Sequence, residues 1–184
     1  SNGRFIIQPK RLYCASASSQ RVNIARIAAN DPSGLSAITV VMKMMIKSVV
    51  NGGNFFACSG DTANFLTLKN QNSAVNKFRG IIASTSYDIP VEYSLNTPFT
   101  VGFRYDGSNV TLWKENAIQH TQAATVTFGT ATRDYQINAD FATNVRHDIS
   151  VYFFRVWLSA LSDDNMKLAL SGLSVGTPVV DLRF

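Results

Sequence analysis

Phe99-Thr-Val-Gly-Phe-Arg-Tyr-Asp-Gly-Ser-Asn-Val-Thr-Leu-Trp-Lys-Glu-Asn-Ala-Ile118 is the stretch of sequence that decides the fold. It predicts two alternating strands joined at Asp106-Gly107, which is a strong short-range hairpin signal. A two-residue loop would pair Tyr105 with Ser108, and a four-residue loop would pair it with Val110. Both registers keep the apolar residues on a common face, so the hairpin does not depend on the turn type. Those residues are Val101, Phe103, Tyr105, Val110 and Leu112.

Short strand-like runs recur along the rest of the chain, with turn signals between them and no intervening helices. This pattern favours an antiparallel sandwich or barrel over alternating strands and helices. The run 37–46 is rich in β-branched residues, and we expect it to form a central strand. The predicted strands cover residues 22–27, 37–46, 54–58, 64–68, 78–83, 91–95, 99–105, 109–114, 124–128, 134–138, 149–158 and 178–184.

One short helix is predicted near the end of the chain. Ser162 is a good N-cap, and Asp163-Asp164 place negative charge at the positive end of the helix dipole. Leu161 and Met166 occupy hydrophobic-staple positions around the cap, and Gly172 can end the helix. An apolar stripe at helical spacing follows, made of Met166, Ala169, Leu170 and Leu173. We expect this helix to cover part of the sandwich.

Composition predicts a single globular domain over residues 1–184, because the chain is 46% hydrophobic and 16% charged. The net charge is +5, but the basic residues are scattered, which disfavours nucleic acid as a partner. The most apolar run, 38–50, is broken by Lys43 and Lys47 and is too short for membrane insertion. Cys14 and Cys58 are the only cysteines. Two buried free thiols are the default expectation, and a disulfide between them stays open.

Two segments resemble the concanavalin A-like lectin/glucanase superfamily, and most closely its laminin G-like (pentraxin-like) branch. The first is Thr100–Ser108 followed by Val110–Asn116, which is similar to that family's strand, Tyr-Asp-Gly-Ser turn and second strand. The second is Phe154–Asn165, which resembles its late aromatic strand, Ala-Leu-Ser-Asp and short helix. The resemblance implies an all-β, antiparallel two-sheet jelly-roll β-sandwich with one short C-terminal helix. It implies glycan or protein partners, and it does not imply catalysis.

Catalytic patterns are missing from the sequence, and we predict that the protein is not an enzyme. Glycoside hydrolysis needs two neighbouring carboxylates, but Glu92 and Glu115 are the only glutamates and neither lies in the Glu-x-Asp-x-x-Glu pattern of the related glucanases. Gln136-Ile137-Asn138 lacks the histidine of the jelly-roll lyases. His120 and His147 have no nucleophile pattern around them, so structural or solvated roles are favoured.

Glycan binding would use aromatic rings with nearby amide or guanidinium groups. Trp113 is the first candidate, because alternation places it opposite Leu112 and away from the core. Arg104 projects to the same outer face, and a four-residue loop would put Gly102 across from Trp113 and leave the ring open. Tyr135 and Arg133, in an expected rim loop, are the second pair of candidates. The alternative is that Trp113 packs under a loop or helix and that Tyr135 caps a sheet edge.

No resident cofactor is predicted, and calcium stays open. The aspartates near turns are the candidate ligands, but none forms a dense Asp-x-Asp cluster. They are Asp31, Asp61, Asp106, Asp134 and Asp140. Trp157, just before the helix, is expected to be a core or helix-packing residue.

The sequence therefore predicts a non-catalytic binding or adhesion module that recognises carbohydrate. We expect it outside the cell, on a cell surface or on a virion, with a glycan or another surface protein as its partner. The alternative is a purely structural module, such as a viral tail, fibre or capsid decoration, or an oligomerisation unit. A binder should expose Trp113 or Tyr135, whereas an assembly module should bury them in a subunit interface.

Overall fold

The computed structural model describes residues 6–8, 11–15, 21–50, 53–58, 66–70, 76–82, 85–126, 128, 134–138 and 147–184, with the backbone alone for 6–8, 58 and 85–90. No helix within these ranges has the length and apolar character needed to cross a membrane.

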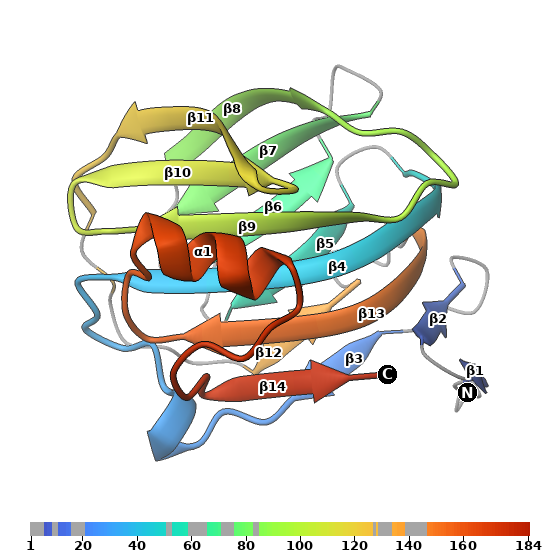
Figure 1. Cartoon of the computed structure of the whole chain (residues 1–184), viewed down its shortest axis with the longest axis horizontal. Helices are drawn as coiled ribbons and strands as arrows, with labels where there is room; N and C mark the ends of the chain where they lie inside the picture. Colours follow the sequence, from blue (N-terminus) through green and yellow to red (C-terminus); the bar gives the residue numbers. More distant parts are fainter. Residues whose placement is uncertain are drawn as a thin grey trace.

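The described strands form two antiparallel sheets packed face to face (Figure 1). Sheet A contains β1 (Ile6–Gln8), β2 (Arg11–Cys14), β13 (Asp148–Trp157), β4 (Ile38–Ser48), β9 (Phe99–Tyr105), β10 (Asn109–Lys114) and β11 (Ala117–Ala123), in that order, and β14 (Val180–Arg183) also pairs with β13. Sheet B contains β3 (Val22–Ile24), β12 (Tyr135–Ile137), β5 (Asn54–Cys58), β6 (Leu66–Asn70), β7 (Lys77–Ile82) and β8 (Thr85–Glu92), in that order. The predicted all-β sandwich of two antiparallel sheets with one short helix is confirmed.

The hairpin of β9 and β10 uses the four-residue loop. Tyr105 pairs with Val110, and the Asp106 carboxylate accepts hydrogen bonds from the backbone N–H groups of Ser108 and Asn109 at 2.9 and 2.7 Å. Gly107 has a φ of +95°, a backbone conformation that L side chains rarely adopt. Aspartate and glycine at these two positions therefore close the turn, as the sequence predicted.

The main core lies between the two sheets. On β4, alternate residues point into it and are fully buried: Ile38, Val40, Met42, Met44 and Ile46. Opposite them, the ring of Phe55 meets those of Phe78 and Tyr93 edge to face, each with a centroid distance of 5.6 Å. The expected central position of β4 is confirmed, because β4 lies between β13 and β9 in sheet A.

The helix α1 (Asp163–Leu170) lies on the outer face of sheet A (Figure 1). The Ser162 hydroxyl caps it by accepting a hydrogen bond from the Asn165 N–H. At the other end, Gly172 has a φ of +88°, and the N–H groups of Gly172 and Leu173 donate to Ala169 and Leu168 at 3.1 Å each. This is a Schellman motif, and it turns Leu173 out of the predicted apolar stripe. Leu173 is accordingly 56% exposed.

Some strand predictions were wrong or incomplete. The predicted strand 124–128 is not a strand in the described residues 124–126 and 128; β11 lies just before it, at 117–123. The apolar side chains that suggested this strand do reach the core, but the Val126 backbone bonds to the Tyr105 hydroxyl instead of a neighbouring strand. β1 and β2 were not predicted. The predicted strand 91–95 overlaps the end of the longer β8.

Candidate functional site

Trp113 lies on the outer face of sheet A, as alternation predicted, but its side chain is only 2% exposed. It belongs to a second apolar cluster formed where α1 packs on the sheet, together with Met166 and Leu170. Gly102 lies across from it in the register, and a Cβ added there would be 2.5 Å from the Met166 Cε. The helix therefore fills the space beside the glycine. The prediction of an open tryptophan ring was wrong, because α1 covers it.

Arg104 is beside Trp113, as predicted, with its guanidinium carbon 5.9 Å from the centre of the ring. Its Nη1 donates to the backbone oxygen of Leu161 at 2.8 Å and to the Asp163 carboxylate at 2.7 Å. These acceptors lie immediately before α1 and at its first residue. Trp113 and Arg104 thus hold the helix on the sheet, which is the alternative considered from the sequence for Trp113.

Tyr135 is fully buried in the main core, and its hydroxyl donates to the backbone oxygen of Asn30. The expectation of an exposed ring in a rim loop was wrong, because Tyr135 is the first residue of β12 and faces inward between the sheets. Arg133 lies outside the described residues. Tyr135 and Arg133 therefore do not form an exposed binding surface among the described residues.

No group of three or more potential metal ligands occurs among the described residues. Asp31 accepts hydrogen bonds from Arg26 and Ser33, and Asp134 accepts one from the Arg26 N–H. Asp106 closes its hairpin turn. Asp61 and Asp140 lie outside the described ranges, so the question of calcium at those positions stays open.

The histidines have different surroundings. His147 is fully buried and stacks on Phe55 with a centroid distance of 4.5 Å. Its Nδ1 accepts a hydrogen bond from the Val50 N–H at 3.0 Å, so the ring is neutral. Burial lowers the pKa of His147 to about 4, which agrees with a structural role. His120 lies on the exposed strand β11.

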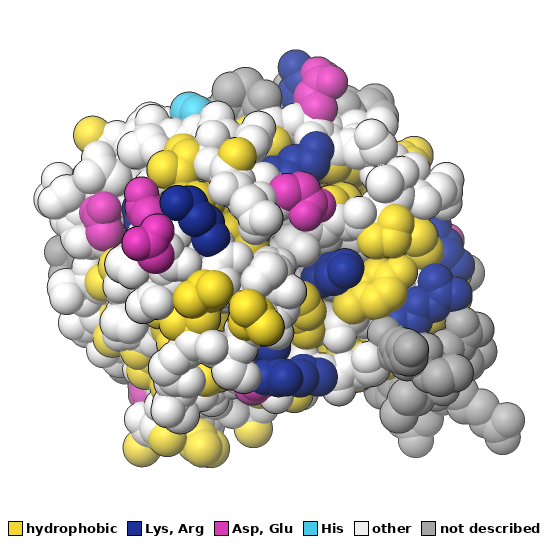
Figure 2. Space-filling model, viewed as in Figure 1, with side chains coloured by type: hydrophobic (Ala, Val, Ile, Leu, Met, Phe, Trp, Pro, Cys, Tyr) yellow, Lys and Arg dark blue, Asp and Glu magenta, His cyan; other side chains and the backbone are white. Residues whose placement is uncertain are grey.

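A surface of aromatic and basic side chains lies on the half of sheet A that α1 leaves open. We call it the Tyr–Lys patch and define it as Tyr13, Lys43, Lys47 and Tyr152, all half-buried. The Lys47 ammonium lies 4.1 Å from the centre of the Tyr13 ring, and the Lys43 ammonium lies 5.7 Å from that of Tyr152. Figure 2 shows hydrophobic side chains bordered by lysine and arginine over this part of the sheet.

Two β-bulges help to place these side chains on one face. Between β13 and β4, Val151 pairs with Met44 and Phe153 pairs with Lys43, so Tyr152 is an extra residue in β13. Further along, Asp148 pairs with Ser48 and Ile149 with Ile46, so Lys47 is an extra residue in β4. A bulge re-aims a side chain and is common next to functional sites.

Tyr13 remains a hydrogen-bond donor at neutral pH. Its pKa is raised above the usual value, first by burial and then by the negative charge of Asp148. The patch therefore combines half-buried tyrosine rings, phenolic hydroxyls and ammonium groups, with a lysine ammonium over each ring.

A cavity of about 130 Å³ adjoins the patch. We call it the C-terminal cavity; it lies between the loop 174–178 and the strands β13 and β14, and Arg155, Trp157, Asp181 and Arg183 contribute to its walls. Arg183 pairs with Phe153, and the Phe184 N–H donates to the Tyr152 oxygen at 3.1 Å. These contacts place the cavity next to Tyr152.

Sequence reasoning missed both regions. Lys43 and Lys47 did carry a signal, because they interrupt an otherwise apolar strand and leave part of one face polar. Tyr13 and Tyr152 carried none, since β2 was not predicted and a bulge cannot be read from alternation.

The sequence matches no protein-family model and no curated protein. Solved structures share the fold. Domain 4 of AbnA, an extracellular arabinanase from Geobacillus stearothermophilus solved in complex with arabinotriose, aligns with a TM-score of 0.63 at 13% identity, over 76% of this chain and 69% of that chain. A putative carbohydrate binding protein from Bacteroides ovatus aligns with a TM-score of 0.70 at 10% identity, over 89% of this chain and 48% of that one.

A heptameric SAP-like pentraxin from Limulus polyphemus aligns with a TM-score of 0.59 at 11% identity, over 76% of this chain and 72% of that one. At these identities the likeness is one of fold. It agrees with the predicted two-sheet β-sandwich, while the concanavalin A-like superfamily and its laminin G-like branch stay predictions.

Proposed function

We propose that this protein is a non-catalytic carbohydrate-binding module and that the Tyr–Lys patch is its binding surface. The single observation that carries the proposal is the position of Tyr13 and Tyr152, which are half-buried on an open sheet face, each with a lysine ammonium over its ring. Sugar rings present C–H groups that pack on aromatic faces, and their hydroxyls bond to phenolic and ammonium donors. We place the module in a secreted, cell-surface or virion protein, where glycans are displayed.

The spacing of carboxylates on this face supports binding over hydrolysis. Asp148 begins β13, and Asp181 pairs with Arg155 seven residues further along the same strand. At about 3.3 Å per residue they are on the order of 20 Å apart. A glycosidase pair is roughly 5–10 Å apart. The structural neighbours described as carbohydrate-binding add support at the level of fold.

A glycan-array screen of the whole chain, with and without calcium, tests this function. We expect binding that weakens at least about tenfold, or about 1.4 kcal/mol, in Tyr152→Ala. Ile118→Ala is the matched control, because it truncates an exposed apolar side chain on the far edge of the same sheet. If no glycan binds a correctly folded chain, or if Tyr152→Ala binds as well as the parent, the proposal is wrong.

A second function, assembly with another copy of this chain, is favoured by β11. This strand pairs with β10 on one side, its side chains are exposed except for the half-buried His120, and it forms the edge of sheet A among the described strands. It has no charged residue or proline, which commonly protect a sheet edge from pairing. Sedimentation velocity over a concentration series should show a dimer that Thr121→Pro abolishes. A monomer at every concentration would exclude this function.

A further inference from the structure

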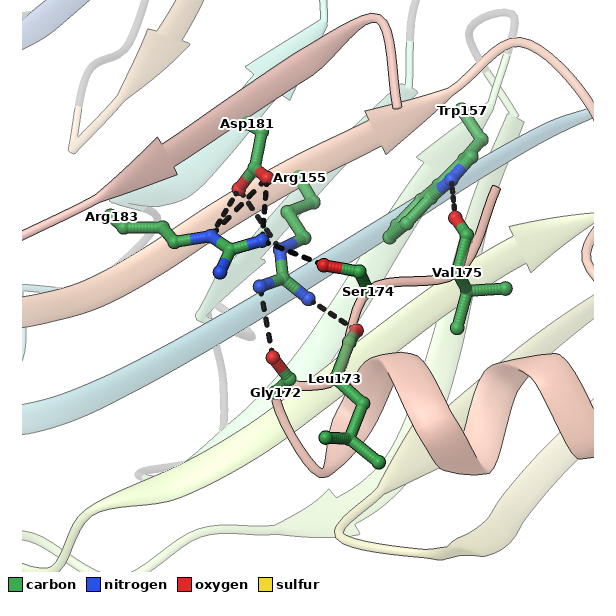
Figure 3. Close-up of polar contacts among 8 residues, drawn as sticks. All are labelled: Arg155, Trp157, Gly172, Leu173, Ser174, Val175, Asp181 and Arg183. Carbon is green, nitrogen blue, oxygen red and sulfur yellow. Dashed lines mark hydrogen bonds and ion pairs between the residues drawn. The ribbon is translucent and has the colours of Figure 1, made fainter. Parts of the chain in front are cut away.

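Hydrogen bonds and ion pairs tie together the walls of the C-terminal cavity (Figure 3). The Trp157 Nε1 donates to the Val175 oxygen at 2.9 Å and holds the loop against β13. Arg155 donates to the oxygens of Leu173 and Gly172 at 2.8 and 3.0 Å and thereby anchors the end of α1. A site with pre-ordered walls loses little conformational entropy on binding.

The charges around the cavity do not balance. Arg155 and Arg183 both donate to Asp181, at 3.0 Å and 2.9 Å, so two guanidinium groups face one carboxylate and one positive charge is in excess. Hydrogen bonds from Arg183 and Arg155 lower the pKa of Asp181 against the opposing effect of burial, so this carboxylate is ionised at neutral pH. The Arg155 side chain is 2% exposed and all three of its nitrogens are bonded.

The excess charge is therefore accessible at Arg183, whose side chain is 55% exposed. Its Nε and Nη2 bond to Asp181, and Nη2 also bonds to the Ser174 hydroxyl oxygen at 3.1 Å, which leaves Nη1 without a partner in the described part of the chain. Since the Ser174 oxygen acts as the acceptor, its own proton can be donated. Thr177 supplies a second hydroxyl to the wall. These groups form a set of donors around one accessible cation.

A second cation lies in the same cross-strand row. Lys43 of β4 and Arg183 of β14 both pair with Phe153 of β13, one from each side. Two strand spacings separate them, which is about 10 Å between backbones. Tyr152 directly precedes Phe153, and the centre of its ring lies 5.7 Å from the Lys43 ammonium. Its backbone oxygen accepts a hydrogen bond from the N–H of Phe184, the residue after Arg183.

We infer that this face is selective for anionic sugars, with Arg183 and the hydroxyls of the C-terminal cavity holding a carboxylate or sulfate group of a glycan whose ring packs on Tyr152. The inference rests on the proposed function and names its substrate class. A neutral sugar would leave the accessible guanidinium without an anionic partner, whereas a carboxylate or sulfate accepts charge-assisted hydrogen bonds from it.

Calorimetric titration of the whole chain with matched oligosaccharides tests the inference. One arm compares an oligogalacturonate with its carboxyl-reduced neutral form, and the other compares a sulfated oligosaccharide with its desulfated form. We expect the anionic member of at least one pair to bind about tenfold more tightly, with a preference that declines as salt rises. The arm that shows the preference identifies the anionic group.

Variants separate this site from general attraction between a basic protein and a polyanion. Arg183→Gln should remove most of the preference for the anionic form, because it deletes the accessible guanidinium, and Arg183→Lys should restore part of that preference. Lys77→Gln removes the same charge from sheet B, on the other side of the sandwich, and should change nothing.

Equal binding of the anionic and neutral forms would overturn the inference and leave the proposed function standing. Binding of neither form, together with a negative glycan array, would overturn both. Tight binding of a single-stranded oligonucleotide that is equally sensitive to Lys77→Gln would indicate non-selective polyanion binding and would also overturn the inference.

Discussion

The missing side chain at Gly102 allows α1 to lie directly on sheet A. A methyl group there would be 2.5 Å from the Met166 Cε and 3.3 Å from the Leu170 Cδ2. We predict that Gly102→Ala lowers the free energy of unfolding by about 1–3 kcal/mol, because the extra carbon overpacks this contact. Urea denaturation measures the change.

Met166→Ala provides the control for this prediction. It removes the methyl group that the new Cβ would meet, so Gly102→Ala should cost less in that background, and the two changes should be non-additive. Additive effects in the double-mutant cycle would show that the two positions do not contact each other as described.

Protonation of His147 couples stability to pH. Burial lowers the pKa of His147 to about 4, against an ordinary value near 6.5, so the unfolded chain binds the proton more tightly than the folded chain. Stability is then complete above pH 6.5 and falls as the pH drops toward 4. We predict a loss of about 2 kcal/mol between pH 7 and pH 5 at about 1.4 kcal/mol per pH unit.

Chemical denaturation across this pH range tests the prediction. The loss should disappear in His147→Gln and persist in His120→Gln, whose histidine lies on the exposed strand β11. An unchanged slope in His147→Gln would assign the pH dependence to other groups.

For single residues, the sequence predicted the sheet face on which a side chain lies better than it predicted what packs against that side chain. Alternation placed Trp113 on the outer face and Leu112 on the inner face, and both placements are confirmed. It could not show that α1 covers Trp113, because that depends on packing between segments about fifty residues apart. Tyr152 was missed for a related reason, since its direction is set by a bulge.

Among the elements, α1 depends on its caps because it has only eight residues. The Ser162 hydroxyl satisfies the Asn165 N–H at the start of the helix. We predict that Ser162→Ala lowers the free energy of unfolding by about 1 kcal/mol, as is typical for loss of an N-cap. Thermal and urea unfolding measure it.

The matched control is Ser171→Ala, which changes the same residue type at the other end of the helix, where the hydroxyl bonds to the Leu168 oxygen and is exposed. We expect a smaller effect there. Equal losses for the two variants would show that the Ser162 cap is not the dominant contact.

Elements with strong local sequence signals, such as α1, were predicted well, whereas elements with weak signals, such as β11, were not. Ser162, Asp163 and Gly172 together specified the limits of α1 to within a residue or two. β11 has the sequence Ala-Ile-Gln-His-Thr-Gln-Ala. Because this strand is exposed at the edge of the sheet, its residues do not alternate between apolar and polar, and there was no strand pattern to detect.

In the molecule as a whole, Cys14 reports on the opening of sheet A. Its side chain is fully buried, and burial raises the pKa of the thiol to about 12. The test uses a Cys58→Ser variant, in which Cys14 is the only thiol. We predict that a thiol reagent at pH 8 modifies Cys14 at least about a hundredfold more slowly in the folded variant than in the urea-unfolded variant. The reason is that the reaction requires β2 to separate from β13. Comparable rates would mean that this edge of the sheet opens freely.

The two-sheet architecture followed from the sequence because many independent hairpin and strand signals agreed. The proposed binding surface did not follow from the sequence, because its parts come from β2, β4, β13 and β14, which are far apart along the chain. Only the pairing of both chain-terminal regions with β13 brings Tyr13, Tyr152 and Arg183 onto one face.

The end of α1 at Gly172 determines how much of the outer face of sheet A the helix leaves uncovered. Figure 1 shows α1 running toward the half of the sheet that carries the Tyr–Lys patch. Each further helical turn would extend it by about 5.4 Å in that direction. Under the proposed function, a related chain whose helix ends later would present a shorter platform and accept fewer sugar units, without any change in its strands. The position of this one glycine would then limit the length of the ligand that the sheet face accommodates.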